Sequence, residues 1–268
     1  MTPPSSMGRI APDAGAPVVA EDPRSPHPQP YGWIAKIGLI VPSTNTVNEA
    51  EWARMLPPGI SVHTSRVLLL GESSRESFDA MTRLVEKAAQ ELATAEVGLI
   101  AYGCTSGSFL RSSDEIRGTI TKIAGCPAVT TSDAVVAALR ALGARRVALA
   151  TPYLDFVTRE EVDFLGREGF EVPSWHGLCL GNTQAQRRSI NRVPADVTLR
   201  LARFVDRPEA DAIFLSCTAL PTIAVIAALE DELGKPVVTS NQATLWHTLR
   251  SLGIGERIAG FGALLERF

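Results

Sequence analysis

The stretch GLIAYGCTSGS, residues 98–108, sets the pattern for the rest of the chain. Its apolar half is typical of a buried parallel strand, and the strand ends in Gly103, Cys104 and a cluster of small hydroxyl residues. In an open α/β sheet, ligands bind at the carboxyl ends of the strands. A thiol at such an end is well placed to meet a small anionic substrate.

A second stretch, DAIFLSCTALPT at residues 211–222, has the same order of apolar run, cysteine and hydroxyl residues. It belongs to a repeat whose matching segments lie about 110 residues apart. Residues 36–42, 59–71 and 127–132 match residues 146–152, 169–181 and 236–241. The repeat predicts two similar halves, with Cys104 and Cys217 facing each other across one pocket. The alternative is that βα units resemble one another without a repeat.

The composition of the 268 residues is that of an ordinary globular protein, with 45% hydrophobic and 21% charged residues. A net charge of -3 gives no general attraction to nucleic acid or to anionic membranes. No apolar run approaches the ~18 residues of a membrane span. Four cysteines without CxxC or zinc-ligand spacing argue against a disulfide scaffold and a metal site. Free thiols in the cytoplasm are the expectation.

We expect three regions along the chain. Residues 1–32 are rich in proline and poor in large apolar side chains, so they predict a disordered tail. Residues 33–143 predict a first α/β domain and residues 144–253 a second. Residues 254–268 are expected to return to the first domain, with a strand over 257–262. The predicted fold is α/β, with two pseudo-symmetric domains, each a mainly parallel sheet flanked by helices, and an active site in the cleft between them.

The apolar spacing of the first half predicts its elements individually. Strands are expected at residues 34–41, 60–70, 97–102 and 127–130. Helices are expected at residues 46–55, 78–95, 113–123 and 133–142.

Two thiols on opposite sides of a planar carbon suit a definite chemistry. One thiolate can remove a proton or add to a double bond on one face, while the other thiol delivers a proton from the opposite face. A helix N-terminus just beyond each cysteine would lower its pKa. Neither step requires a cofactor, and the sequence has no Walker loop or GxGxxG. Cys126, and Cys179 inside an apolar strand, are expected to be structural.

The segments IGLIVPSTNT (37–46), YGCTSGS (102–108) and LSCT (215–218) resemble the maleate cis-trans isomerase and arylmalonate decarboxylase group. This group belongs to the aspartate/glutamate racemase superfamily, and the resemblance covers about residues 34–265. It implies a cofactor-free site between two α/β domains. In the isomerases, a thiolate attacks maleate, a succinyl thioether forms, the former double bond rotates, and the second cysteine assists before fumarate leaves. By this analogy Cys104 is the nucleophile and Cys217 its partner, although the residues alone do not say which one attacks.

The resemblance also implies that Asn45, Tyr153 and Asn182 bind substrate carboxylates. Judged from the residues alone, Asn45 could equally cap a helix, Tyr153 could simply pack, and Asn182 could supply a turn. Four hydroxyl residues complete the expected substrate-binding set: Ser43, Thr105, Ser106 and Thr218. Such donors suit carboxylates without a buried arginine, and we expect Arg187 and Arg188 on the solvated surface.

Several functions remain open at this stage. The resemblance implies glycine in the decarboxylases where this chain has Cys104, so two thiols argue against decarboxylation. Amino-acid racemases of the superfamily keep both cysteines, which leaves a two-base racemase of aspartate-like or ectoine-derived compounds as the alternative. A non-catalytic dicarboxylate binder and a Cys–His hydrolase using His63, His176 or His247 are further alternatives.

The expected partner is a small carboxylate substrate, without nucleic acid or membrane, and a homo-oligomer is left open. Residues 71–77 are expected to form either a lid over the substrate or a solvated loop.

Overall fold

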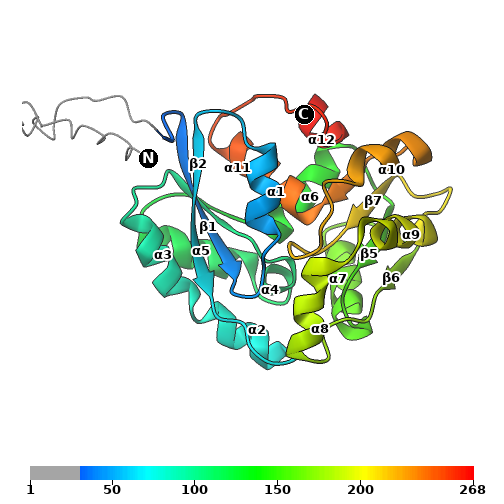
Figure 1. Cartoon of the computed structure of the whole chain (residues 1–268), viewed down its shortest axis with the longest axis horizontal. Helices are drawn as coiled ribbons and strands as arrows, with labels where there is room; N and C mark the ends of the chain where they lie inside the picture. Colours follow the sequence, from blue (N-terminus) through cyan, green and yellow to red (C-terminus); the bar gives the residue numbers. More distant parts are fainter. Residues whose placement is uncertain (1–30) are drawn as a thin grey trace, which may run out of the picture. The chain divides into compact units, whose positions relative to one another are not determined.

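Two four-stranded parallel sheets organise residues 31–268, the part of the chain that this computed structural model describes (Figure 1). The first sheet has the order β2-β1-β3-β4 and the second the order β6-β5-β7-β8. Their strands are β1 (Ala35–Pro42), β2 (Ile60–Val67), β3 (Leu99–Tyr102), β4 (Ala128–Thr130), β5 (Val147–Thr151), β6 (Trp175–Gly177), β7 (Ala212–Leu215) and β8 (Val237–Thr239). The expected tail over residues 1–32 lies, except for its last two residues, outside the described part.

Helices alternate with the strands in both halves, as parallel connections require. In the first half they are α1 (Asn48–Met55), α2 (Arg75–Thr82), α3 (Val85–Ala93), α4 (Thr105–Phe109), α5 (Ser113–Ala124) and α6 (Thr131–Ala141). In the second half they are α7 (Asp155–Arg167), α8 (Gln184–Ser189), the 3₁₀ turn η1 (Ile190–Arg192), α9 (Ala195–Val205), α10 (Ile226–Leu233), α11 (Ser240–Ser251) and α12 (Ala263–Arg267).

The expected α/β fold with two similar halves is confirmed, and the likeness extends to single residues. The two sheets have the same strand order. Gly59 and Gly169, which match in the repeat, have φ angles of 87° and 90°. Gly143 and Gly253, which end the last helix pair of the two halves, have φ angles of 71° and 74°. A positive φ favours glycine, so the repeat keeps this residue where the backbone demands it.

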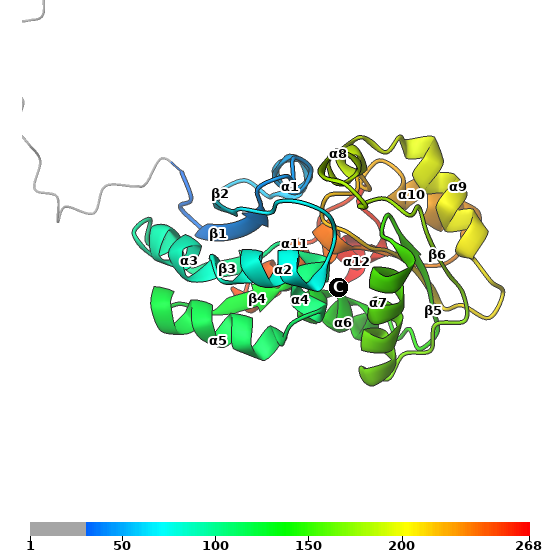
Figure 2. The ribbon, with the colours of Figure 1, turned by 90° about the horizontal axis from the view of Figure 1, so that it is seen from below.

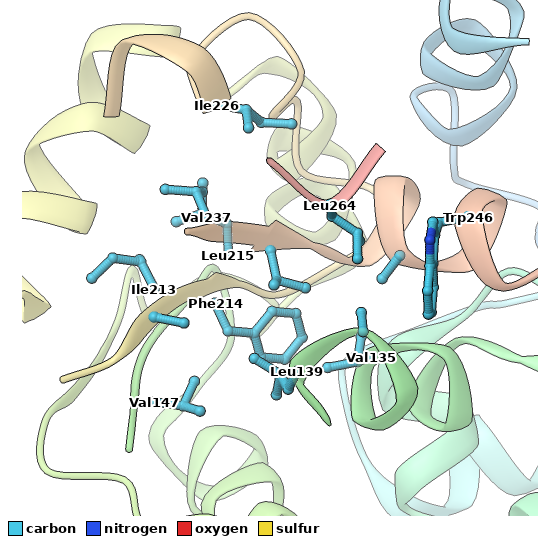
Figure 3. Packing of buried hydrophobic residues seen from close by; sticks show 14 of the residues in the cluster. Val135, Leu139, Val147, Ile213, Phe214, Leu215, Ile226, Val237, Trp246 and Leu264 are labelled. Atoms are coloured by element: carbon cyan, nitrogen blue, oxygen red, sulfur yellow. The ribbon is translucent and has the colours of Figure 1, made fainter. Parts of the chain in front are cut away.

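The two halves share one apolar core. Helix α6 of the first half packs against α11 of the second, and both helices contact β4 and β8. Figure 3 shows Val135 and Leu139 of α6 beside Phe214 of β7, with Trp246 of α11 nearby. Because the closing helix of each half packs against both sheets, burial of apolar surface holds the halves together.

Three expected elements differ in the structure. The helix expected at 78–95 is two helices, because the chain makes a tighter turn where the Leu84 N–H bonds to the Met81 carbonyl over 3.0 Å. The strand expected at 60–70 ends at Val67, where its partner strand β1 also ends.

The third difference is at the C-terminus. Residues 257–262 form no strand, and α12 packs on α11 and β8 of the second half. The Ala263 N–H donates to Glu230 of α10, and Leu264 is buried in the shared core (Figure 3). These contacts place α12 on the second half, whereas we expected residues 254–268 to return to the first domain.

None of the helices within residues 31–268 is both long enough and apolar enough to cross a bilayer.

Candidate active site

A pocket lies at the carboxyl ends of the central strands, and both halves line it. Figure 2 shows α2 and α4 of the first half facing α7 and α8 of the second across this region. Seven of the expected site residues lie in its wall: Asn45, Cys104, Thr105, Ser106, Tyr153, Cys217 and Thr218. The remaining wall is formed by Pro42, Thr44, Leu69, Ser73, Phe78, Arg187, Ile190 and Ala219. The two thiols therefore share one pocket.

Cys104 caps a helix with its sulfur. It is the N-cap residue of α4, and its Sγ accepts a hydrogen bond from the Gly107 N–H over 3.3 Å. Burial raises the pKa of the Cys104 thiol, whereas this N–H, the Ser106 hydroxyl and the nearby Arg187 charge lower it. Only 4% of the residue is exposed. The groups around Cys104 thus favour its thiolate against the cost of burial.

Cys217 sits in a different backbone. Its φ of 100° is in the left-handed region, and a turn follows it, so the helix expected directly beyond this cysteine is absent. Among the backbone N–H groups of residues 31–268, that of Ala219 donates to Cys217 Sγ, over 3.4 Å. Burial raises the pKa of this thiol to about 12, and the charges of Cys104 and Glu161 push it in the same direction. A hydrogen bond from Tyr153 opposes these effects.

Hydrogen bonds across the pocket fix the two cysteine loops to each other. Asn45 Nδ2 donates to Thr218 Oγ1 over 3.1 Å, and that hydroxyl donates to the Gly103 carbonyl over 3.0 Å. Ser240 Oγ accepts from Thr105 Oγ1 and from the Cys217 N–H, each over 2.9 Å. Ser240 was missed by sequence reasoning, although the repeat pairs the segments that hold Thr131 and Ser240.

Asn45 bonds to the backbone near the start of α1 and also lies in the pocket wall. Its Oδ1 accepts from the N–H groups of Val47 and Asn48, over 2.9 and 3.1 Å, in the turn that leads into α1. The same side chain reaches the pocket through Nδ2. The bonds to the backbone therefore orient the amide toward Thr218.

Two expected substrate-binding residues lie outside the pocket wall. Ser43 Oγ accepts from the Leu69 N–H over 3.0 Å and so fixes the segment after β2. Asn182 is exposed, and its N–H donates to Gln186 Oε1 in the turn before α8. Gly181 turns away from the pocket with a φ of 123°, which carries the next side chain outward.

The expectation of a pocket without a buried arginine is wrong. Arg187 is only 5% exposed and lies in the pocket wall, because α8 packs against the segment of residues 71–77. Arg187 Nη2 donates to Ser73 and Ser77 Oγ over 3.4 and 3.3 Å. The Ser73 N–H donates to the Gly181 carbonyl over 2.9 Å, so the segment expected to be a lid or a loop bridges the two halves. Arg188 is exposed, as expected.

A buried carboxyl group lies behind Cys217. Glu161 of α7 is 1% exposed and accepts from Ser216 Oγ over 2.7 Å. Burial raises the pKa of Glu161 to about 8. Sequence reasoning missed it, because a glutamate at helical spacing looks like any solvated residue until the fold places it against the end of β7.

The other cysteines and the histidines lie elsewhere. Cys179 follows β6 instead of lying in a strand, and it is exposed, with a φ of 54°. His63 bonds to Ser61, and none of the histidines within residues 31–268 lies in the pocket wall. In the same range, no cluster of three or more His, Cys, Asp or Glu residues could hold a metal ion. A Cys–His pair in this pocket is thereby ruled out for the described residues.

A two-half α/β protein with one thiol from each half in a shared pocket is the class that this geometry defines. The family model described as arylmalonate decarboxylase matches residues 37–265. The maleate isomerase of Nocardia farcinica is 32% identical over 247 residues, which cover 87% of this chain and 96% of that protein. The arylmalonate decarboxylase of Bordetella bronchiseptica is 33% identical over 234 residues, covering 86% and 96%. The chain belongs to the arylmalonate decarboxylase family, which includes the maleate isomerases.

A solved structure supports the same assignment. It is a Cys-to-Ser mutant of the N. farcinica maleate cis-trans isomerase with a covalently bound succinylcysteine intermediate. Its TM-score to this chain is 0.82 at 28% identity, with 87% of this chain and 99% of that chain covered. The shared fold therefore extends over nearly all of the described residues.

Proposed function

We propose that the protein is a cofactor-independent cis-trans isomerase of a small dicarboxylate, of the maleate-to-fumarate type. The observation that carries the proposal is the pair of thiols in one pocket with unequal surroundings. Burial raises the pKa of both thiols, but the Gly107 N–H and Arg187 oppose this effect at Cys104, whereas the charges of Cys104 and Glu161 add to it at Cys217. Cys104 is therefore the better thiolate, and Cys217 is the group that holds a proton.

The proposed reaction begins when the Cys104 thiolate adds to one alkene carbon. A C–S bond forms, and the electron pair of the double bond moves to the other carbon, which takes the proton of the Cys217 thiol. The remaining C–C single bond then rotates. The Cys217 thiolate takes the proton back, the C–S bond breaks, and the trans alkene leaves with the Cys104 thiolate restored. Electrons and protons balance without any further reactant.

The donors around the thiols suit the carboxylates of such a substrate. The hydroxyls of Ser106 and Thr218 and the amide of Asn45 lie in the wall beside them. Tyr153, at 7% exposure, adds a phenol next to Cys217. Hydrogen bonds from these fixed donors would hold the carboxylates while the central bond rotates.

Proton NMR of the reduced protein with maleate in D2O tests the proposal. We expect a growing fumarate signal, lost in Cys104→Ser and in Cys217→Ser. Cys179→Ser is the matched control, since that thiol is exposed and outside the pocket, and it should keep full activity. A folded, reduced protein that forms no fumarate would overturn the proposal.

Proton NMR also distinguishes the proposed isomerase from a racemase and from a non-catalytic binder. A two-base racemase would exchange the Cα proton of aspartate for deuterium without changing maleate, and both thiols would be needed. A non-catalytic binder would change neither compound.

A further inference from the structure

Arg187 is a buried cation without a carboxylate partner. At 5% exposure, it lies within 4.0 Å of no carboxylate oxygen among the described residues. Within residues 31–268, its Nη2 donates to the hydroxyls of Ser73 and Ser77, and its Nε and Nη1 have no hydrogen-bond partner. The guanidinium lies over the Phe78 ring, 5.6 Å from its centroid.

This arrangement is costly unless an anion completes it. A buried charge is normally paired, and removal of its partner is strongly destabilising. Burial lowers the pKa of Arg187, and the charges of Cys104 and Glu72 oppose that effect. Nε and Nη1 lie on different edges of the guanidinium plane, so one carboxylate would accept from one of these two groups and not from both at once. Among the described residues the charges of Cys104 and Glu72 act on Arg187 without forming an ion pair with it, so two of its donor nitrogens are left for an anion from outside the protein.

We propose that Arg187 binds one carboxylate of the substrate and makes the pocket selective for aliphatic dianions. The inference rests on the proposed function only in placing the substrate between the two thiols. One carboxylate lies among the amide and hydroxyl donors near Thr218, and the other pairs with Arg187 beside Cys104.

An uncharged or aromatic group on the Arg187 side fits poorly. It would shield the guanidinium from water and leave Nε and Nη1 without partners. The Phe78 ring and the apolar side chains of Leu69 and Ile190 also lie in this wall, so solvent could not replace the missing anion easily. Ligands without a second carboxylate leave the Arg187 donors without partners, so the pocket should select dianions.

Binding of succinate, which has no double bond to isomerise, tests the inference without relying on turnover. Titration calorimetry would compare succinate with succinamate, in which one carboxylate is an amide. We expect wild-type protein to prefer succinate by about 10- to 100-fold, the range for a hydrogen-bonded charge. In Arg187→Met this preference should collapse, and in Arg187→Lys part of it should return.

Arg188→Met, next in the chain and exposed, is the matched control and should bind like wild type. Ligand-free Arg187→Met should melt no lower than wild type, because it loses an unpaired buried charge. A lower melting temperature with an unchanged succinate preference would assign Arg187 a merely structural role and overturn the inference. Equal binding of succinate and succinamate by wild type would overturn it without any variant.

The two proposals fail in different ways. Dianion selectivity without fumarate formation would remove the isomerase proposal and keep the role of Arg187. Fumarate formation without dianion selectivity would do the reverse.

Discussion

The Asn45 side chain donates a hydrogen bond to Thr218 Oγ1 over 3.1 Å, and so joins the first strand end of one half to the cysteine loop of the other. The Thr218 hydroxyl in turn donates a hydrogen bond to the carbonyl of Gly103, one residue before Cys104. The loops that carry the two thiols are thus joined by the Thr218 hydroxyl, in addition to the Ser240 hydroxyl, which accepts from Thr105 and from the Cys217 N–H. Two segments far apart in the sequence are thereby held close together in the pocket wall.

Thr218→Val removes this hydroxyl and keeps the side-chain shape. We expect kcat/KM for the proposed reaction to fall at least about tenfold, because the two thiols lose their common anchor. Stability should fall by about 1–3 kcal/mol, since Asn45 Nδ2 is left without its partner. Urea unfolding and NMR rates measure the two effects. Thr121→Val, on the exposed side of α5, should change neither, and equal rates for both variants would contradict the anchoring role.

Glu161→Gln tests the buried carboxyl behind Cys217. The folded-state pKa of about 8 lies above the ordinary value of 4.5, so neutral Glu161 stabilises the fold at low pH. That contribution is lost as the pH rises from about 4.5 through about 8, by at most ~1.4 kcal/mol per pH unit. Glutamine accepts the same Ser216 bond and cannot ionise. The variant should therefore gain stability relative to wild type toward pH 8, as chemical denaturation at several pH values would measure. Parallel stability curves for the two proteins would be inconsistent with a buried neutral Glu161.

Gly107→Ala probes the packing behind Cys104. A Cβ at this position would lie 2.6 Å from the Tyr102 hydroxyl and 3.0 Å from Cys104 Sγ. We expect the sulfur to move and lose its Gly107 N–H bond, with slower alkylation by iodoacetamide and a large loss of activity. The control is Gly118→Ala in α5, where a Cβ meets nothing within 4 Å and helix propensity improves by about 1 kcal/mol. An unchanged alkylation rate of Cys104 in Gly107→Ala would show that the Gly107 N–H bond does not control the reactivity of this thiol.

Glu51→Gln tests the anchor beneath the second cysteine loop. Glu51 accepts from the N–H groups of Thr222 and Ile223 over 2.5 and 3.0 Å, and from Asn241 Nδ2 over 2.7 Å. In glutamine an NH2 group replaces one of the two accepting oxygens and would face an N–H donor. The free energy of unfolding should therefore fall by about 1–3 kcal/mol. Glu49→Gln, which loses only an exposed ion pair with Arg66, should cost less than about 1 kcal/mol. Thermal melts compare the two variants, and similar losses would argue against the anchor.

The sequence was sufficient for the fold and for the centre of the site because both depend on local patterns. Buried parallel strands are continuous apolar runs, and the stretches ending in Cys104 and Cys217 are of this kind. Their spacing also implied that two equivalent strand ends meet. The division at residue 143 into two domains stays a prediction, because the shared core of α6 and α11 links the halves.

The parts that sequence reasoning missed depend on packing between distant segments. Arg187 follows polar residues and precedes Arg188, so nothing local distinguishes it from a surface residue. It is buried only because residues 71–77 cross to the other half and cover it. Ser43 and Asn182 lie outside the pocket wall for a local reason: the Ser43 hydroxyl binds the Leu69 N–H, and Asn182 lies in the exposed turn before α8.

The left-handed backbone of Cys217 was also beyond prediction. The Cys-Thr sequence is the same at both sites, yet only Cys104 begins a helix. This difference places the two thiols in different backbone surroundings.

The most direct test of the account is where a dicarboxylate becomes attached. Cys217→Ser and Cys104→Ser would each be incubated with maleate, quenched in acid, and mapped by peptide mass spectrometry. We predict one added dicarboxylate on Cys104 in the Cys217→Ser protein and no adduct in Cys104→Ser, with Cys179→Ser behaving as wild type. An adduct on Cys217 in Cys104→Ser, or turnover by wild type with neither thiol ever labelled, would contradict Cys104 as the nucleophile.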